Sequence, residues 1–190
     1  VLEEAGGFPV AMEDGVAVFH PGDLLSGQTR RIFLTLNLPV SDPGEYTLSG
    51  LSVRYLHNGT SRSVMLPVPM SLAVIEEKSE ALASIDSDEW SHKVLQEDYN
   101  TMREDVAKAV SQGDLEGALG RIEAYEQEAG AINEVVQSPS VSSNLEEDVS
   151  ELRDSVSQAF AGEDASENAE RQQIFSKEEQ MDSYRSRRAY

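Results

Sequence analysis

The sequence contains no cysteine, which excludes disulfide bonds and thiolate metal sites but leaves the compartment of the protein open. Aromatic residues make up only 6% of the 190 residues, so we expect a mainly aliphatic core. No apolar run approaches the roughly 18 residues that a membrane-spanning helix needs. The sequence therefore predicts no insertion of this chain into a membrane.

Positive charge is also scarce. The chain has 15 Lys and Arg against 35 Asp and Glu, a net charge of −20. Binding to nucleic acid or to an anionic lipid surface requires an excess of basic side chains on some face. We therefore expect neither partner, whereas a basic protein partner is compatible with this charge. The first residues, Val1 to Glu4, are neither an initiator methionine nor a signal peptide, which is typical of a fragment or a processed product.

The residues that are present divide the chain in two. Residues 1–75 hold six of the seven prolines and eight of the thirteen glycines, with a net charge of −3. Residues 76–190 carry a net charge of −17 and few helix breakers. We predict an α+β chain of two modules. A small antiparallel β-sandwich spans residues 1–76, and an acidic antiparallel bundle of three to four helices spans residues 77–190.

In the first module, alternating apolar residues predict about five strands. One covers residues 32–38 and ends at a proline, and another runs without a break over residues 64–74. The apolar positions change phase at Gly50, which suggests a bulge. Asn58-Gly59 has the composition of a tight hairpin turn.

In the second module, the apolar residues recur at helical spacing. Gly113 ends the first helix, and Asp114 can cap the next. A fourth helix over residues 165–188 has few apolar anchors, so it is either docked along a narrow seam or partly free. The predicted helical stripes cover residues 95–109, 115–136 and 141–160.

Two adjacent arginines, Arg30 and Arg31, are the first candidate for binding chemistry. They could form a small anion site or simply mark the polar start of a strand. Neighbouring strand residues point to opposite faces, so the two side chains cannot converge on one phosphate. Gly22 and Gly27 lack the spacing of a phosphate-binding loop. The structural interpretation is therefore favoured.

Residues 86–97, DSDEWSHKVLQE, partly match a calcium-binding loop. Trp90 and Ser91 stand where that loop needs an oxygen ligand and a glycine, so the segment fits a helix start better, with Asp86 or Ser87 as its cap. The histidines show no metal-ligand spacing among themselves. They are His20, His57 and His92.

The remaining candidates also have simpler structural explanations. The acidic run Glu146-Glu147-Asp148 is typical of a solvated helix face, and the glycosylation sequon at Asn58 coincides with the hairpin turn. Residues 113–127 are similar to one tetratricopeptide helix pair, but no second copy follows. We therefore predict no catalytic, cofactor-binding or metal-binding residues, and no cofactor.

The stretch GDLLSGQTRRIFLTLNLP at residues 22–39, followed by LSVRY at 51–55, resembles the segment after the von Willebrand factor A domain in many bacterial proteins. In those chains a similar turn feeds a strand of a β-sandwich. Residues 107–119 resemble a helical hairpin of the same proteins, and residues 182–190 resemble their common ending.

This resemblance implies an accessory region rather than the A domain itself. The adhesion motif of that domain, D-x-S-x-S, does not occur in this sequence. The resemblance thus implies a non-enzymatic region that scaffolds or positions an upstream A domain of the same chain, or binds another protein. An independent helical adaptor or cell-envelope binding module is the alternative, and an unrelated hydrolase is a more distant one.

Overall fold

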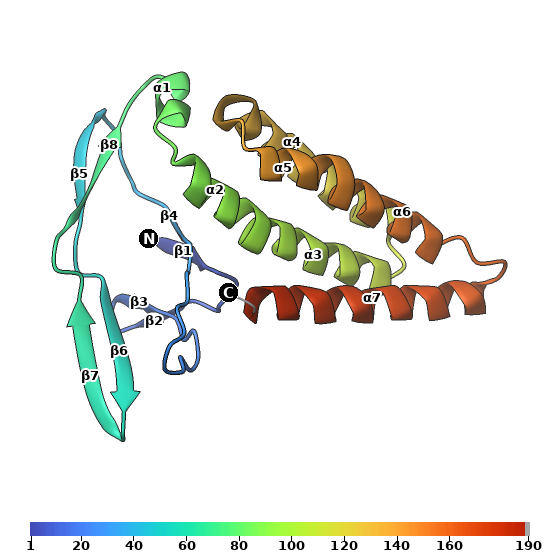
Figure 1. The fold of residues 1–190 in the computed structure, drawn as a ribbon, viewed down its shortest axis with the longest axis horizontal. Coiled ribbons are helices and arrows are strands. Elements are labelled where there is room, and N and C mark those ends of the chain that lie inside the picture. The colour runs from blue at the N-terminus through green and yellow to red at the C-terminus, as the bar shows by residue number, and fades with distance from the viewer. Residues whose placement is uncertain (189–190) are drawn as a thin grey trace. The chain divides into compact units, whose positions relative to one another are not determined.

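The computed structural model describes residues 1–188 and shows an α+β chain in which the strands precede the helices (Figure 1). The prediction of this order is confirmed. Among the described residues, no helix combines the length and the apolar composition needed to cross a bilayer. The strands are β1 (Leu2–Ala5), β2 (Ala11–Glu13), β3 (Val16–Val18), β4 (Leu34–Leu36), β5 (Gly44–Leu48), β6 (Ser52–His57), β7 (Thr60–Met65) and β8 (Met70–Val74).

All strand pairs are antiparallel, as predicted, but each described sheet has only two strands. The pairs are β1 with β4, β2 with β3, β5 with β8, and β6 with β7. Asn58 and Gly59 both have positive φ, at 50° and 74°, and join β6 to β7 in the predicted hairpin. The described strand pairs are therefore antiparallel but form no larger sheet, and the β-sandwich stays a prediction.

Three details of the strand prediction were wrong. The continuous strand over residues 64–74 is interrupted between β7 and β8, where Pro67 and Pro69 remove backbone donors from the ladder. Gly50, with φ at 83°, lies between β5 and β6 and marks a change of sheet instead of a bulge. The strand expected at 32–38 is also shorter, since β4 has only three residues.

The chain divides into two compact units. The first combines residues 1–37 with residues 82–190, and the second consists of residues 38–81. Strands β1 to β4 thus belong with the helices, whereas β5 to β8 form the second unit, which we call the strand unit. The first unit is called the helical unit below.

The helical part contains two π-helical turns, η1 (Val94–Asp98) and η2 (Asn144–Asp148), each inserted into a longer helix. The first helix runs through α2 (Ser87–Lys93), η1 and α3 (Tyr99–Ser111), and another through α5 (Pro139–Ser143), η2 and α6 (Val149–Ala159). The others are α1 (Lys78–Ala83), α4 (Leu115–Val136) and α7 (Ala165–Arg188).

The caps of these helices follow the sequence closely. The side chain of Asp86 accepts a hydrogen bond from the backbone of Glu89 at 2.9 Å, so it caps α2 as expected. Asp114 caps α4 by accepting from the backbone of Gly117 at 2.8 Å, directly after Gly113 with its φ of 73°. These two turns join consecutive helices without a long loop.

The long helices form a bundle in which α3 packs on α4, α4 on α6, α6 on α7, and α7 back on α3 (Figure 1). Its core is aliphatic, as predicted, and the three expected stripes supply most of it. Fully buried members include Val106, Ile122 and Val156, while Tyr125 is the largest aromatic contributor. Leu115, at the start of the second stripe, is partly exposed instead.

Helix α7 is docked, which decides between the two alternatives left open for residues 165–188 (Figure 1). Its apolar Ile174 and Met181 are exposed, and Phe175 is the buried apolar anchor. Ser176 and Ser183 are also buried, and Ser176 Oγ donates to the carbonyl oxygen of Ala107 at 2.9 Å. Small polar residues therefore let α7 approach α3 closely.

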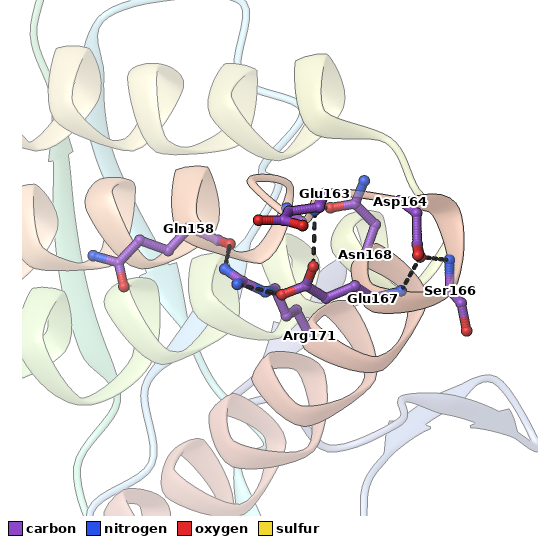
Figure 2. A network of polar contacts seen from close by, with 8 residues as sticks. Gln158, Glu163, Asp164, Ser166, Glu167, Asn168 and Arg171 are labelled. Atoms are coloured by element: carbon purple, nitrogen blue, oxygen red, sulfur yellow. Dashed lines mark hydrogen bonds and ion pairs between the residues drawn. The ribbon is translucent and has the colours of Figure 1, made fainter.

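The connection between α6 and α7 is held by side chains that bond to the backbone (Figure 2). Asp164 Oδ1 accepts from the N–H groups of Ser166 and Glu167 at 2.8 and 2.9 Å. Glu167 in turn accepts from the N–H of Glu163, and Arg171 donates to its carboxylate at 2.6 Å. The Glu163 hydrogen bond and Arg171 lower the pKa of Glu167, so this carboxylate stays charged at the start of α7.

Candidate functional site

The paired arginines bind different parts of the chain. Arg30 donates to the carbonyl oxygens of Pro21 and Asp23, the latter at 3.2 Å, and so braces the preceding loop. Arg31 instead pairs with Glu89 of α2 at 3.4 Å. Both residues precede β4. Their side chains do not converge on a common point, as we expected for two neighbouring residues of an extended chain. Their roles in the structure are to hold the loop and to tie it to α2.

The other candidates from the sequence also lie apart. His57 is next to the hairpin turn, where its Nε2 lies 3.4 Å from the side chain of Asn58, whereas His92 Nδ1 lies 2.8 Å from the carbonyl oxygen of Asp88. Within residues 1–188, no three His, Asp or Glu side chains gather closely enough to hold a metal ion. Among the acids, Glu147 accepts from Ser143 at 3.3 Å and Asp148 from Asn144 at 2.8 Å.

The strand unit carries an exposed apolar face on the β6–β7 hairpin. Val53 pairs with Val64 in the register, and the neighbouring pair Leu51 and Leu66 lies on the same face because positions two apart share a side. Val53 and Val64 are 65% and 55% exposed. Tyr55 extends the face toward the turn. Within the strand unit, residues 38–81, no side chain is fully buried.

The helical unit carries a groove of about 590 Å³ between the α2–η1–α3 helix and the α5–η2 segment. Both π-helical turns border it, through Leu95 and Gln96 on one wall and Asn144 and Asp148 on the other. Such turns are rare and often occur at functional sites, because they interrupt the regular hydrogen-bond ladder. The groove is therefore the place where the helices depart most from regular geometry.

Serines and an asparagine join the two walls at one end of the groove. Ser91 of α2 and Ser138, which caps α5, are hydrogen-bonded through their hydroxyl groups at 2.7 Å. Asn133 at the end of α4 accepts from the backbone of Ser138 at 2.8 Å and donates to Ser142 at 2.9 Å. These bonds hold the walls at a fixed distance.

A second network holds the floor of the groove. Tyr125 donates to Asn144 Oδ1 at 2.7 Å, and Asn144 donates onward to Asp148 at 2.8 Å. Burial raises the pKa of Tyr125, and the charge of Asp98 raises it further. The phenol of Tyr125 therefore stays protonated and can donate to Asn144. Asn144 in turn holds Asp148 in position.

Tyr99 and Arg103 line the groove where α7 approaches it. Burial raises the pKa of Tyr99 to about 12, and its ring lies 5.7 Å from the ring of Tyr125. The guanidinium of Arg103 lies over Tyr99 at 5.7 Å and donates to Glu179 of α7 at 2.6 Å. Burial alone would lower the pKa of Arg103, but its hydrogen bond to Glu179 raises it above the ordinary value. The positive charge of Arg103 is therefore already balanced by the carboxylate of Glu179.

Glu97, on η1, is the most strongly perturbed carboxyl. It is 7% exposed and lies beneath the N-terminal strands, where the backbone N–H of Gly6 donates to it. Burial raises its pKa to about 7, Lys93 lowers it, and Glu4 and Asp98 raise it. Lys93 is bound to both oxygens of Asp98, at 2.6 and 2.8 Å. Because the packing around Glu97 raises its pKa, the protonation of this carboxyl depends on the packing of the N-terminal segment.

The groove could not be predicted from the sequence, because Ser, Asn and Gln at helical spacing have the same pattern as a solvated surface. The burial of Glu97 could not be predicted either. This residue is the last one of the segment 86–97, which partly matches a calcium-binding loop. Comparison of the chain with protein families, with curated proteins and with solved structures found no match.

Proposed function

We propose that this chain is a non-enzymatic accessory region of a von Willebrand factor A-type protein. Its strand unit packs against the A domain of the same protein or strands next to it, and its helical unit offers an acidic surface to a protein partner. The residues Gly22 to Gln28 belong to the stretch on which the resemblance rests. They end in a turn in which Gly27 has a φ of 82° and the backbone N–H of Gln28 donates to the carbonyl oxygen of Leu25 at 3.0 Å.

The observation that carries the proposal is the exposed apolar face of the β6–β7 hairpin. A two-stranded sheet is marginally stable in water unless further strands or a helix cover it. Here the face formed by Leu51, Val53, Tyr55, Val64 and Leu66 is open, and the strand unit has no buried side chain of its own. A second sheet packed on this face would complete the sandwich expected from the sequence.

Charge separates the proposed roles of the two units. Residues 46–75 contain Arg54 and Arg62 but no acidic residue, whereas residues 76–190 carry a net charge of −17. Like charges repel, so the helical unit favours a basic partner and the hairpin does not share that preference.

The alternative is an independent helical adaptor or a cell-envelope binding module with its own ligand. One observation favours it: the helical unit has a continuous core, which includes Val106, Ile122 and Val156, and a groove of its own. A unit with such a core can fold without the A domain. Under this alternative, the strand unit would have no role in positioning another domain.

Hydrogen exchange on the hairpin separates the two functions. We expect the amides of β6 and β7 to exchange quickly in the isolated chain and to become protected when the A domain is co-expressed with it. Replacing Val53 and Val64 by Ser should abolish this protection. Leu56→Ser, on the opposite hairpin face and 77% exposed, is the matched control.

Two results would reject the accessory role. One is equal protection of the hairpin with and without the A domain. The other is protection that survives the loss of both valines, because the apolar face would then be irrelevant to the contact.

A further inference from the structure

The groove between the π-helical turns contains groups suited to a polypeptide. Its walls carry uncharged side chains that both donate and accept hydrogen bonds, among them Ser87, Ser140, Gln96 and Asn100. Such groups match the alternating N–H and C=O groups of an extended backbone. Its volume of about 590 Å³ lies within the range of roughly 300–1,000 Å³ that is usual for ligand pockets.

The groove is lined by two carboxylates on opposite walls and by the guanidinium of Arg103. Asp88 projects from α2 and Asp148 from η2, and no cation among the described side chains forms an ion pair with either of them. Arg103 is the nearby guanidinium, but it is paired with Glu179 at 2.6 Å and lies 3.9 Å from Asp182. The two aspartates therefore make this part of the groove attractive to a cation.

Asp148 is also held in place for such a contact. Asn144 donates to it at 2.8 Å, and Asn144 is itself fixed by the buried phenol of Tyr125 at 2.7 Å. An acceptor that is already ordered loses little conformational entropy when a ligand binds. The π-helical turn η2 places both Asn144 and Asp148 on the same wall of the groove, so this irregular turn positions the two residues for the proposed contact.

We propose that this groove binds an extended peptide segment of a partner protein through a lysine or arginine side chain placed between Asp88 and Asp148. The serine and amide side chains of the walls bond to the peptide backbone. The inference rests on the proposal that the helical unit is a protein-binding surface, and it names the chemistry of that partner. It does not depend on the hairpin.

The test is an NMR titration of the 15N-labelled chain with a capped peptide, Ac-Ala-Ala-Lys-Ala-Ala-NH2. The neutral peptide with norleucine in place of lysine is the control ligand. We expect saturable shifts confined to the amides of residues 87–100 and 138–148 with the lysine peptide, and at least tenfold weaker binding of the norleucine peptide.

Two double variants separate a groove from general attraction to an acidic protein. Asp88→Asn with Asp148→Asn should weaken lysine-peptide binding at least tenfold. Asp105→Asn with Asp154→Asn removes the same charge from exposed positions outside the groove and should leave binding unchanged. The spectra themselves report whether each variant is folded.

Shifts spread over all acidic helices, an equal effect of both double variants, or no shifts at millimolar peptide would overturn the proposal. These outcomes do not affect the hairpin exchange experiment, so failure of the groove and failure of the accessory role are distinguishable.

Discussion

Replacing Glu97 by Gln should stabilise the helical unit at alkaline pH and have a smaller effect as the pH falls. The folded state raises the pKa of this carboxyl from 4.5 to about 7, because the side chain is buried beneath the N-terminal strands. The folded state therefore holds a proton that the unfolded state has already released. Between these two pKa values, stability falls as the pH rises.

The size of the effect follows from the shift. Each pH unit between the two pKa values costs about 1.4 kcal/mol, so the full penalty above pH 7 is about 3 kcal/mol. The sequence pI of about 4.3 makes measurements near pH 4.5 unsuitable, because an uncharged protein associates. Over the usable range from pH 5.5 to 8, the expected loss of stability is about 2 kcal/mol, nearly all of it below about pH 7.5.

Urea unfolding followed by the fluorescence of Trp90 is the assay, because this single tryptophan packs against the bundle core. The quantity of interest is the stability of Glu97→Gln minus that of the native chain, measured at each pH. General repulsion among the acidic groups changes in both proteins alike and cancels in this difference. Glu128→Gln, at an exposed position on α4, should show no such trend. A difference that stays constant from pH 5.5 to 8 would refute the reasoning.

Substitutions at three further positions test the packing. Asp164→Ala should lower the stability of the helical unit by about 1 kcal/mol, because two N–H groups at the start of α7 lose their acceptor; thermal unfolding followed by circular dichroism measures it. Ile122→Ala should cost about 3 kcal/mol and Ile122→Val about 1 kcal/mol in urea unfolding, since the side chain is completely buried, and equal costs would contradict a tightly packed core. Glu179→Gln should cost about 1 to 2 kcal/mol and increase hydrogen exchange in α7, because Arg103, with a side chain only 14% exposed, loses its charged partner; unchanged exchange would show that the pair does not hold the helix.

The order of elements could be predicted because local chemistry determines it. Most prolines and glycines and the alternating apolar residues lie in the first part, and the caps at Asp86 and Asp114 need only a few neighbouring residues. The hairpin at Asn58-Gly59 is local in the same sense, since positive φ at both positions is sufficient to make the turn.

Features that depend on distant contacts could not be predicted in this way. Strands β1 and β4 pair although 29 to 34 residues separate the partners, and they belong with the helices although their composition matches that of the strand unit. The π-helical turns carry no composition signal, because each inserts one extra backbone position without changing the kind of residue around it. The groove that these turns border could not be predicted from the sequence for the same reason.

Helix α7 shows why a helix with few apolar residues can still be docked. The α7 residues that bond to α3 follow a spacing of three and four, but they are polar: Ser176, Glu179 and Ser183. Small side chains bring the helix axes close together, so backbone atoms and short hydroxyl groups make the contacts that large apolar side chains make elsewhere. Ser176 bonds to the carbonyl of Ala107 and Ser183 to Glu104 at 2.9 Å each, which satisfies the buried hydroxyl groups. Of the apolar residues in this helix, Phe175 is buried in the core, whereas Ile174 and Met181 are exposed, so the apolar positions identify only part of the surface that holds the helix.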